Sequence, residues 1–384
     1  MDELLLIPGP TPVPAPVREA GARPMTNHRS EAFARVLRNV LDGVAVLYGT
    51  RQAVLPYACS GTGVLEAAVV NTLSPGDEIL ALSCGAFGNR FARIAQAYGA
   101  EVTRVEVEWG QGIPPERLEA ELRQKPYRAV LLTHNETSTG VQNDLQALAQ
   151  ARGDHPALLL VDAVSSLGAV PVEMDSLGLD VVVTASQKAL GCPPGVGFLS
   201  ASPRAWEAYQ KARMPRYYWD MGLLAEALRA PLAQTPFTPA VSVFFSLEES
   251  LRLLQQEGLS AVYERHRRLS QATRAGVEAL GLRPVADPRW ASWTVTAVWA
   301  PEGVSVGALV GRLRAEHGVV VAGGQGKLEG RVFRIGHLGY VYPEDVLRCL
   351  EALGAVLADL GVRVDPRAGV EAAARVFGAR AVTA

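Results

Sequence analysis

The chain contains the stretch Leu179-Asp180-Val181-Val182-Val183-Thr184-Ala185-Ser186-Gln187-Lys188-Ala189-Leu190-Gly191. Its first five residues form an apolar, β-branched run that predicts a buried strand. Two prolines and three nearby glycines in 191–197 interrupt both helix and strand. Lys188 is therefore expected on a tight turn just past a strand end, among small and apolar neighbours. A lysine removed from water can act as a nucleophilic amine, and the alternative is an exposed loop lysine.

Apolar strands and helices alternate through the first half of the chain. Ser30 is a candidate N-cap for a helix through Leu47. The pattern then predicts strands at 78–82, 101–107, 129–133 and 157–162, and helices at 86–98, 115–125 and 144–152. Strands that are apolar on both faces indicate a mostly parallel sheet covered on both sides, so the expected class is α/β.

Polar clusters follow several of these strands. They comprise Ser60 to Gly63, His134 to Thr139, Asp162 with Ser165 and Ser166, and Ser186 to Lys188. The first cluster opens a helix, which makes it a candidate anion site, although it matches neither the dinucleotide fingerprint nor a Walker loop. Ligands of parallel sheets bind at the carboxyl ends of the strands. An anion cradle, an acid and an activated lysine at one edge suit a phosphorylated, cationic heterocycle bound as an imine.

The second half of the chain has a different pattern. Residues 213–223 are expected to be irregular, 235–239 to form a rigid loop, and 246–256 and 259–280 to be helical. Strands at 293–299, 319–322 and 332–336 with a helix at 306–317 predict a smaller α+β domain. The expected division is an N-terminal arm (1–15), a large domain (16–258) and a small C-terminal domain (259–384). The tail 364–384 is expected to form one more helix or to be partly disordered.

Composition excludes several classes of function. The chain has 384 residues, 48% of them hydrophobic, and a net charge of −2, which gives no electrostatic argument for a nucleic-acid or membrane partner. No apolar run has the length of a membrane span. The four cysteines are scattered, so neither a disulfide framework nor a metal site is expected. The N-terminus does not resemble a secretory signal, and a cytoplasmic location is expected.

The ordered motifs resemble the class V pyridoxal-phosphate-dependent aminotransferases, nearest to the alanine/serine–glyoxylate (serine–pyruvate) branch. They are Ser60-Gly61-Thr62-Gly63, Thr133 to Gly140, Val161 to Gly168, Ser186-Gln187-Lys188 and Phe333-Arg334-Ile335-Gly336. The resemblance covers Leu4 to about Leu360. It implies fold type I, with a seven-stranded sheet and a smaller C-terminal domain. It also implies the cofactor pyridoxal 5'-phosphate and a homodimer with shared active sites.

The resemblance assigns roles to individual cofactor-binding residues. Lys188 would hold the cofactor covalently, and Asp162 would pair with its pyridine nitrogen. The alternative for Asp162 is a turn or N-cap acid, and the alternative for Phe87, the candidate ring-stacking residue, is an ordinary core side chain. The remaining assignments place the phosphate on Ser60, Gly61, Thr62 and Gln187, the ring 3-oxygen on Thr137, and phosphate contacts from the partner subunit on Thr235 and Thr238.

Arg334 and Gly9 are the implied substrate-binding residues. A guanidinium matches a carboxylate bidentately, and the alternative for Arg334 is a surface ion pair. The expected reaction moves an amino group from alanine or serine to glyoxylate or pyruvate by a ping-pong mechanism. Three different functions stay open beside it: an aspartate donor held by a further arginine such as Arg29, Arg213 or Arg216; a cysteine desulfurase or lyase; and a non-catalytic scaffold.

Overall fold

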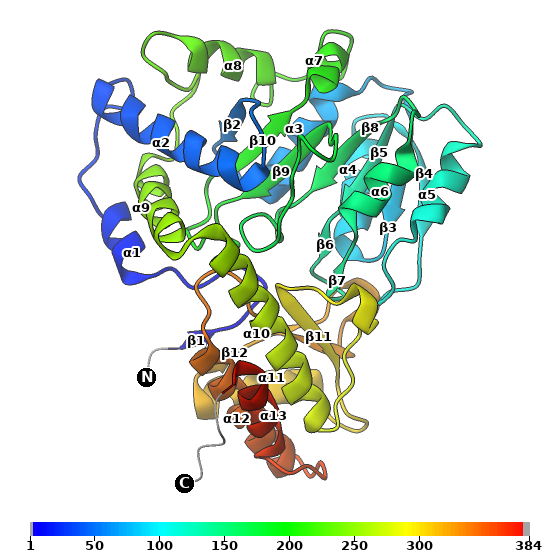
Figure 1. Ribbon diagram of the computed structural model, residues 1–384, viewed down its shortest axis with the longest axis vertical. Coiled ribbons are helices and arrows are strands. Elements are labelled where there is room, and N and C mark those ends of the chain that lie inside the picture. The colour runs from blue at the N-terminus through cyan, green and yellow to red at the C-terminus, as the bar shows by residue number, and fades with distance from the viewer. Residues whose placement is uncertain (1–2, 379–384) are drawn as a thin grey trace.

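A seven-stranded sheet forms the centre of the computed structural model, which describes residues 3–378 (Figure 1). Its spatial order is β2 (Val54–Tyr57), β10 (Gly197–Ala201), β9 (Val181–Ala185), β8 (Leu158–Asp162), β5 (Ala129–Thr133), β3 (Glu78–Ser83) and β4 (Glu101–Glu106). β10 runs antiparallel to both of its neighbours, and the other six strands run parallel to one another. The predicted α/β class with a mostly parallel seven-stranded sheet is confirmed.

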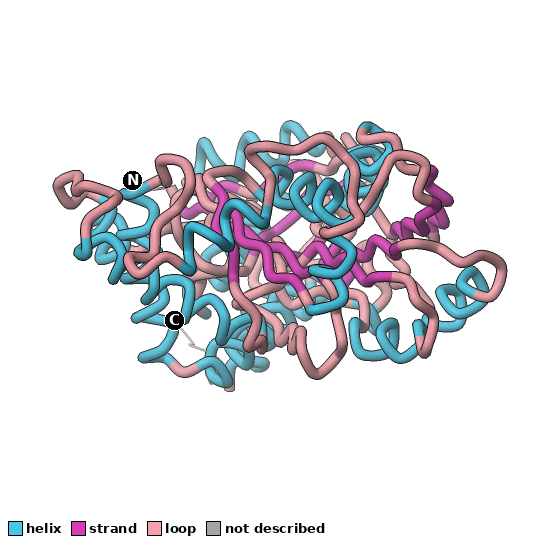
Figure 2. The backbone as a smooth tube through the Cα atoms, turned by 90° about the horizontal axis from the view of Figure 1, so that it is seen from above, coloured by secondary structure: helices cyan, strands magenta, loops and turns pink. Residues whose placement is uncertain are grey.

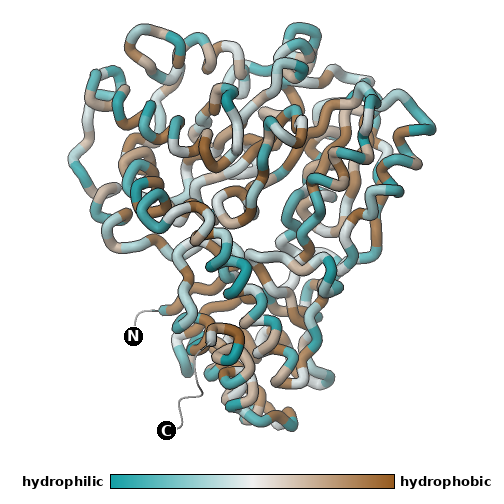
Figure 3. Tube along the Cα trace, viewed as in Figure 1, coloured by the Kyte–Doolittle hydropathy of each residue, from teal (hydrophilic) through white to brown (hydrophobic). Residues whose placement is uncertain are grey.

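Side chains of the central strands alternate between two hydrophobic cores, one on each face of the sheet. In β8, Leu158 and Leu160 belong to one core, and Leu159 and Val161 belong to the other. Every residue of β5, β8 and β9 is buried, as expected for strands of a covered parallel sheet. Figure 2 shows the strands running between helices and loops, and in Figure 3 hydrophobic residues are concentrated along the inner strands.

Helices cover both faces of the sheet. One core includes residues of α3 (Gly61–Thr72), α4 (Ala86–Ala97), α7 (Pro203–Tyr209) and α8 (Met221–Arg229). The other includes residues of α2 (Glu31–Tyr48), α5 (Pro115–Leu122), α6 (Leu145–Arg152) and α9 (Val241–Glu257). Ser30 caps α2 as predicted, because its side chain accepts a hydrogen bond from the main-chain N–H of Phe33 at 3.3 Å.

A third core holds the C-terminal part of the chain together. The long helix α10 (Leu259–Ala279) leads into a small antiparallel sheet of β11 (Val295–Trp299), β14 (Val332–Gly336) and β13 (Ala322–Gly323). Helices α11 (Val306–His317), α12 (Pro343–Asp359) and α13 (Ala368–Phe377) complete it. Helix α13 lies where the tail was expected to be helical or disordered, and 379–384 fall outside the described residues.

The N-terminal segment packs on this C-terminal part. Strand β1 (Leu4–Leu5) pairs in parallel with β12 (Val319–Val320), and the carbonyl of Leu6 accepts a hydrogen bond from Gly336 N at 2.6 Å. Helix α1 (Ala15–Gly21) then packs against α9. The division into 1–15, 16–258 and 259–384 stays a prediction.

Several element boundaries differ from the sequence prediction. The helix expected over 115–125 ends at Leu122, since the residue before Pro126 disfavours helical geometry. The helix expected from Ser246 begins at Val241, where buried Phe244 and Phe245 extend its apolar face. The expected strand 319–322 is divided between β12 and β13.

The segment 213–223, expected to be irregular, contains the start of α8. The side chain of Asp220 caps this helix by accepting hydrogen bonds from Gly222 N and Leu223 N. Strand β10 was not predicted, because it directly follows a proline- and glycine-rich loop.

Within residues 3–378, no helix is both long enough and apolar enough to cross a membrane.

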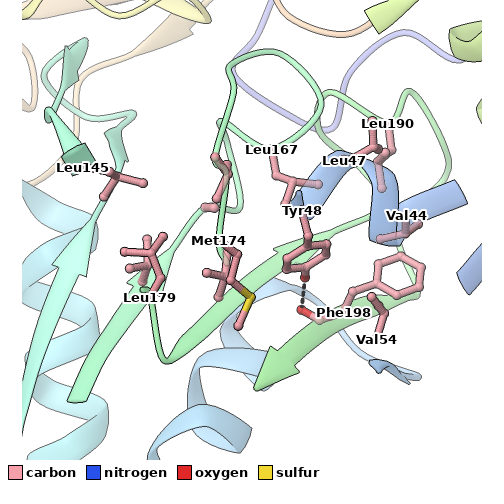
Figure 4. Packing of buried hydrophobic residues seen from close by; sticks show 14 of the residues in the cluster. Val44, Leu47, Tyr48, Val54, Leu145, Leu167, Met174, Leu179, Leu190 and Phe198 are labelled. Atoms are coloured by element: carbon pink, nitrogen blue, oxygen red, sulfur yellow. Dashed lines mark hydrogen bonds between the residues drawn. The ribbon is translucent and has the colours of Figure 1, made fainter. Parts of the chain in front are cut away.

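Tyr48 offers a test of the packing of α2 on the sheet. Its buried hydroxyl donates a hydrogen bond to the carbonyl oxygen of Phe198 in β10 at 2.9 Å (Figure 4). Tyr48→Phe keeps the ring and removes this bond, so we expect the free energy of unfolding to fall by about 1–2 kcal/mol, measured by urea denaturation. The control is Tyr263→Phe, since the Tyr263 hydroxyl has no hydrogen-bond partner in residues 3–378. Equal losses in both variants would contradict a specific role for the Tyr48 hydroxyl.

Candidate active site

A pocket lies at the carboxyl ends of β8 and β9. It is lined by Ser60, Gly61, Thr62, Leu65, Phe87, Arg90, Asp162, Val164, Gln187, Lys188 and Gln325. Seven of these residues were predicted as site residues from the sequence: Ser60, Gly61, Thr62, Phe87, Asp162, Gln187 and Lys188. The structure therefore brings the starts of α3 and α4, the end of β8 and the turn after β9 to one place, as expected for a parallel sheet.

Lys188 lies on the turn that follows β9. Its Nζ donates a hydrogen bond to the carbonyl oxygen of Pro8 at 2.6 Å. Burial lowers the pKa of Lys188 to about 8, against the opposing effect of Asp162, while the charges of Arg334 and Arg90 lower it further. An amine with this pKa has an appreciable neutral fraction near pH 7, so it can serve as a nucleophile or a base.

Gly9 lies directly against the Lys188 amine. A Cβ atom at this position would fall 2.5 Å from Lys188 Nζ, and the backbone φ is +131°. Both the close approach and the backbone conformation therefore require glycine. The structure places Gly9 beside Lys188, and its contact with substrate stays a prediction.

Asp162 is the last residue of β8 and is 5% exposed. Its Oδ1 accepts a hydrogen bond from Val164 N at 2.9 Å. Burial raises the pKa of Asp162 to about 6, although the Val164 hydrogen bond and the charges of Lys188 and Arg90 lower it. A carboxyl group in this state becomes a stable anion when a cation binds beside it.

The turn Ser60-Gly61-Thr62 begins the twelve-residue helix α3 at the pocket wall. The Ser60 side chain makes no capping hydrogen bond to α3. A Cβ at Gly61 would lie 2.9 Å from Val164, so the close packing of this turn requires glycine. Free N–H groups and the positive end of the helix dipole make the turn suitable for an anion.

Gln187 is the next residue of the pocket wall. Its side-chain oxygen Oε1 is buried and has no hydrogen-bond partner within residues 3–378. A buried polar group without a partner is costly, so a bound group that satisfies this amide would be stabilised there.

Arg334 on β14 lies behind the pocket, 5% exposed. Its Nε donates to the carbonyl of Gly323 at 2.8 Å, and its Nη1 donates to the carbonyl of Thr137 at 3.3 Å and to Gln325 Oε1 at 3.2 Å. Within the described residues, Nη2 has no hydrogen-bond partner. Burial lowers the pKa of Arg334 to about 10, which still leaves the guanidinium charged at neutral pH.

Thr137 connects Arg334 to the rest of the site. Its hydroxyl shares a hydrogen bond of 2.9 Å with the Ser165 hydroxyl, three residues after Asp162. The structure therefore places Thr137 next to the predicted site, although it does not line the pocket itself.

Thr235 and Thr238 do not lie in the Lys188 pocket of the same chain. They line a separate pocket with Tyr57, Tyr218 and Phe237, where the Thr235 hydroxyl donates to the Phe237 carbonyl at 2.7 Å. Their assignment to a partner subunit's phosphate site stays a prediction.

Glu136 is a buried residue of the site whose individual role was not predicted. Its carboxylate accepts hydrogen bonds from Phe87 N and Gly88 N, both at 3.0 Å, and from the Ser138 hydroxyl at 2.6 Å. It thereby ties the loop after β5 to the start of α4, which carries Phe87. Burial raises the pKa of Glu136, and its charge also raises the pKa of Asp162.

Arg90 and Gln325 were not predicted either. The Arg90 guanidinium lies 4.7 Å from the centre of the Phe87 ring, and its Nη1 donates to Thr62 Oγ1 at 3.5 Å. The spacing of Arg90 from Phe87, one helical turn along α4, was a signal that could have located it. No local sequence signal identifies Gln325.

The three arginines considered as second cations do not line the pocket. Arg29 donates to the Gln234 side chain, and Arg216 donates to the Val70 carbonyl and pairs with Asp220. Arg213 contributes its main-chain N–H to a hydrogen bond with Ser74. Within residues 3–378, no group of three or more His, Cys, Asp or Glu side chains is arranged to hold a metal ion.

Known proteins match nearly the full length of the chain. Residues 17–328 match the family Aminotransferase class-V. A Synechococcus sp. protein named "Soluble hydrogenase, small subunit" is 46% identical over 97% of this chain and 98% of its own. The L-aspartate–glyoxylate aminotransferase of Paracoccus denitrificans is 40% identical, and the serine–glyoxylate aminotransferase of Methylorubrum extorquens is 36% identical, each over 96% of this chain and 94% of its own.

A solved structure shows the same fold. The pyridoxamine–pyruvate aminotransferase of Mesorhizobium loti superposes with a TM-score of 0.94 at 31% identity, covering 98% of both chains. This agreement extends over the sheet and the C-terminal part described above. The chain therefore belongs to the class V aminotransferases and is a pyridoxal-phosphate-dependent transaminase.

Proposed function

We propose that the protein transfers an amino group from a small L-amino acid, alanine or serine, to glyoxylate or pyruvate. The observation that carries the proposal is the meeting of the Lys188 amine, the Asp162 carboxyl and the Ser60–Thr62 turn in one pocket, with Arg334 behind it. The two half-reactions would follow a ping-pong order, because the same residues serve the donor and then the acceptor.

The pocket residues fit pyridoxal phosphate. The start of α3 suits the phosphate, and the unsatisfied Gln187 amide lies in the same wall. Asp162, at the end of β8, suits a protonated pyridine nitrogen, and the Phe87 ring suits stacking. When bound, the cofactor supplies the electron sink that makes the α-carbon proton of an amino acid removable.

The chain itself supplies binding and proton transfer. Arg334 would hold the α-carboxylate, because its Nη2 hydrogens are free within residues 3–378 and its charge is set deep in the protein. The Lys188 amine, with a pKa of about 8, would take the proton from the α-carbon and return it to the product side. The Pro8 carbonyl and Gly9 would restrict where that amine can move.

An aspartate donor is the second candidate. Arg90 lines the pocket and forms no ion pair with a carboxylate in residues 3–378. A guanidinium in that position can hold a second carboxylate, which aspartate has and alanine lacks.

A sulfur-transfer reaction and a non-catalytic scaffold have less support. None of the four cysteines lines the pocket, and Cys84, Cys192 and Cys349 are buried, which disfavours a desulfurase or lyase. The joint presence of Lys188, Asp162 and Arg334 disfavours a scaffold without activity. The hydrogenase name belongs to the Synechococcus relative, and the pocket residues described here suit amino transfer. The cytoplasmic location stays a prediction.

A panel of substrates tests the proposal. We expect purified protein loaded with pyridoxal phosphate to convert L-alanine or L-serine with glyoxylate or pyruvate into the matching oxo and amino acids, measured by chromatography of the products. L-Aspartate and 2-oxoglutarate complete the panel. Lys188→Ala should lose the activity and also the borohydride-stable attachment of the cofactor, because the reacting amine is gone. Absence of transfer from every donor, or attachment at another lysine, would contradict the proposal.

Arg334→Lys tests the carboxylate site. Lysine keeps the charge but loses the planar pair of donors, at a cost of about 1.5–3 kcal/mol, so KM should rise roughly 10- to 150-fold for donors and acceptors alike. Steady-state kinetics with two donors and two acceptors measure this. Arg331→Lys is the control, since Arg331 is exposed on the neighbouring loop. Weakening of one substrate side alone would remove Arg334 from the common role.

A homodimer with shared active sites is part of the proposal. The exposed side chain of Tyr217 and the stacked pair Tyr218 and Phe237, 5.0 Å apart, lie beside Thr235 and Thr238. Exposed aromatic clusters of this kind are typical of protein interfaces. We expect sedimentation equilibrium to give twice the chain mass of 40.9 kDa. An active species with the mass of one chain would contradict the shared site.

A further inference from the structure

Gln325 is the one pocket-lining residue that comes from the C-terminal part of the described chain. All of the remaining lining residues lie between Ser60 and Lys188. Gln325 precedes the short helix η2 (Gly326–Leu328) in the loop between β13 and β14. This loop therefore contributes a neutral polar side chain to a pocket that is built mainly by the large sheet and its helices.

The orientation of the Gln325 amide follows from its neighbour. A guanidinium has hydrogen-bond donors and no acceptor, so the atom facing Arg334 Nη1 at 3.2 Å must be the amide oxygen. The amide nitrogen, with two N–H groups, then points away from Arg334. It has no hydrogen-bond partner within residues 3–378, and the side chain that carries it lines the pocket. Two unused donors are thus available to a bound molecule.

The loop that carries Gln325 is attached on both sides. On one side, the Gly323 carbonyl accepts a hydrogen bond from Arg334 Nε at 2.8 Å. On the other side, Lys327 pairs with Glu106 and lies 5.4 Å from the centre of the Trp109 ring. The indole Nε1 of Trp109 donates to the same Glu106 carboxylate at 2.7 Å. These contacts hold Gln325 at a defined position between Arg334 and the Lys188 pocket.

We infer that Gln325 selects amino donors that carry an oxygen on the β-carbon. The inference rests on the proposed function, in which Arg334 takes the α-carboxylate and the reacting carbon faces Lys188. The donors of Gln325 lie beside the carboxylate site and on the pocket side of it. The remaining substituent of an amino acid, its side chain, is then the group that can accept their hydrogen bonds. Serine and aspartate have such an oxygen, and alanine does not.

Gln325→Leu tests this inference by removing both donors from a side chain of similar size. The measured quantity is kcat/KM of the donor half-reaction of the holoenzyme with each amino acid. We expect a loss of roughly 10- to 150-fold for L-aspartate and about 2- to 12-fold for L-serine, with L-alanine unchanged, because a hydrogen bond to a charged group is worth more than one between neutral groups. Glyoxylate, which has no side chain, should be equally unaffected in the second half-reaction.

Two further variants make the result decisive. Gln124→Leu removes an exposed glutamine amide far from the pocket and should leave all rates unchanged. Gln325→Glu keeps the shape and replaces the donors by a carboxylate, so it should impair L-aspartate more than L-serine through like-charge repulsion, and it serves if the leucine variant does not fold.

Two outcomes would overturn the inference. Equal losses for alanine, serine and glyoxylate would mean that Gln325 acts on the common carboxylate, and an unchanged serine-to-alanine ratio would mean that it contacts no substrate. Wild-type protein that transfers from no donor would instead overturn the proposed function.

Discussion

A parallel sheet that is buried on both faces has no room for a charged side chain along its strands. In this protein every residue of β5, β8 and β9 is buried, and the polar groups are found where these strands end. Asp162 is the last residue of β8, and Lys188 follows β9 by three residues. The same dryness that stabilises the sheet raises the pKa of Asp162 and lowers the pKa of Lys188. The reactivity of the site is thus a consequence of the packing of the core.

The large sheet was predictable because its signals are local. The boundaries of β5 and β14 agree with the sequence pattern, since each is an apolar run bounded by turn residues. The same holds for α11, which begins after Ser305 and ends before Gly318. Strand β10 has no such boundary, because its first residue, Gly197, belongs in sequence to a loop of prolines and glycines. Its place between β2 and β9 comes from long-range pairing, which no short window of sequence contains.

The candidate site divides in the same way. Residues at the ends of strands or the starts of helices, such as Asp162 and Ser60, were predictable from their position in a βα unit. Arg90, Glu136 and Gln325 were not, because their relevance depends on side chains that contact them only in the folded chain. Glu136 meets Phe87 and Gly88 across 48 or more positions. Gln325 reaches the pocket because β13 and β14 pair in register, with Ala322 opposite Arg334.

The hydrogen bond between Lys188 and Pro8 has a consequence for the order in which the molecule is made. The segment that bears Pro8 is anchored by β1 to β12, and these partners are more than 300 positions apart in the sequence. A ribosome releases residues 4–9 among the first and residues 319–336 among the last. The amine-bearing turn can form as soon as β9 joins the sheet, but its covering by the N-terminal segment must wait for the C-terminal part. A nascent chain interrupted before that point would carry a reactive lysine without its neighbours, so the finished contact marks a completely synthesised protein.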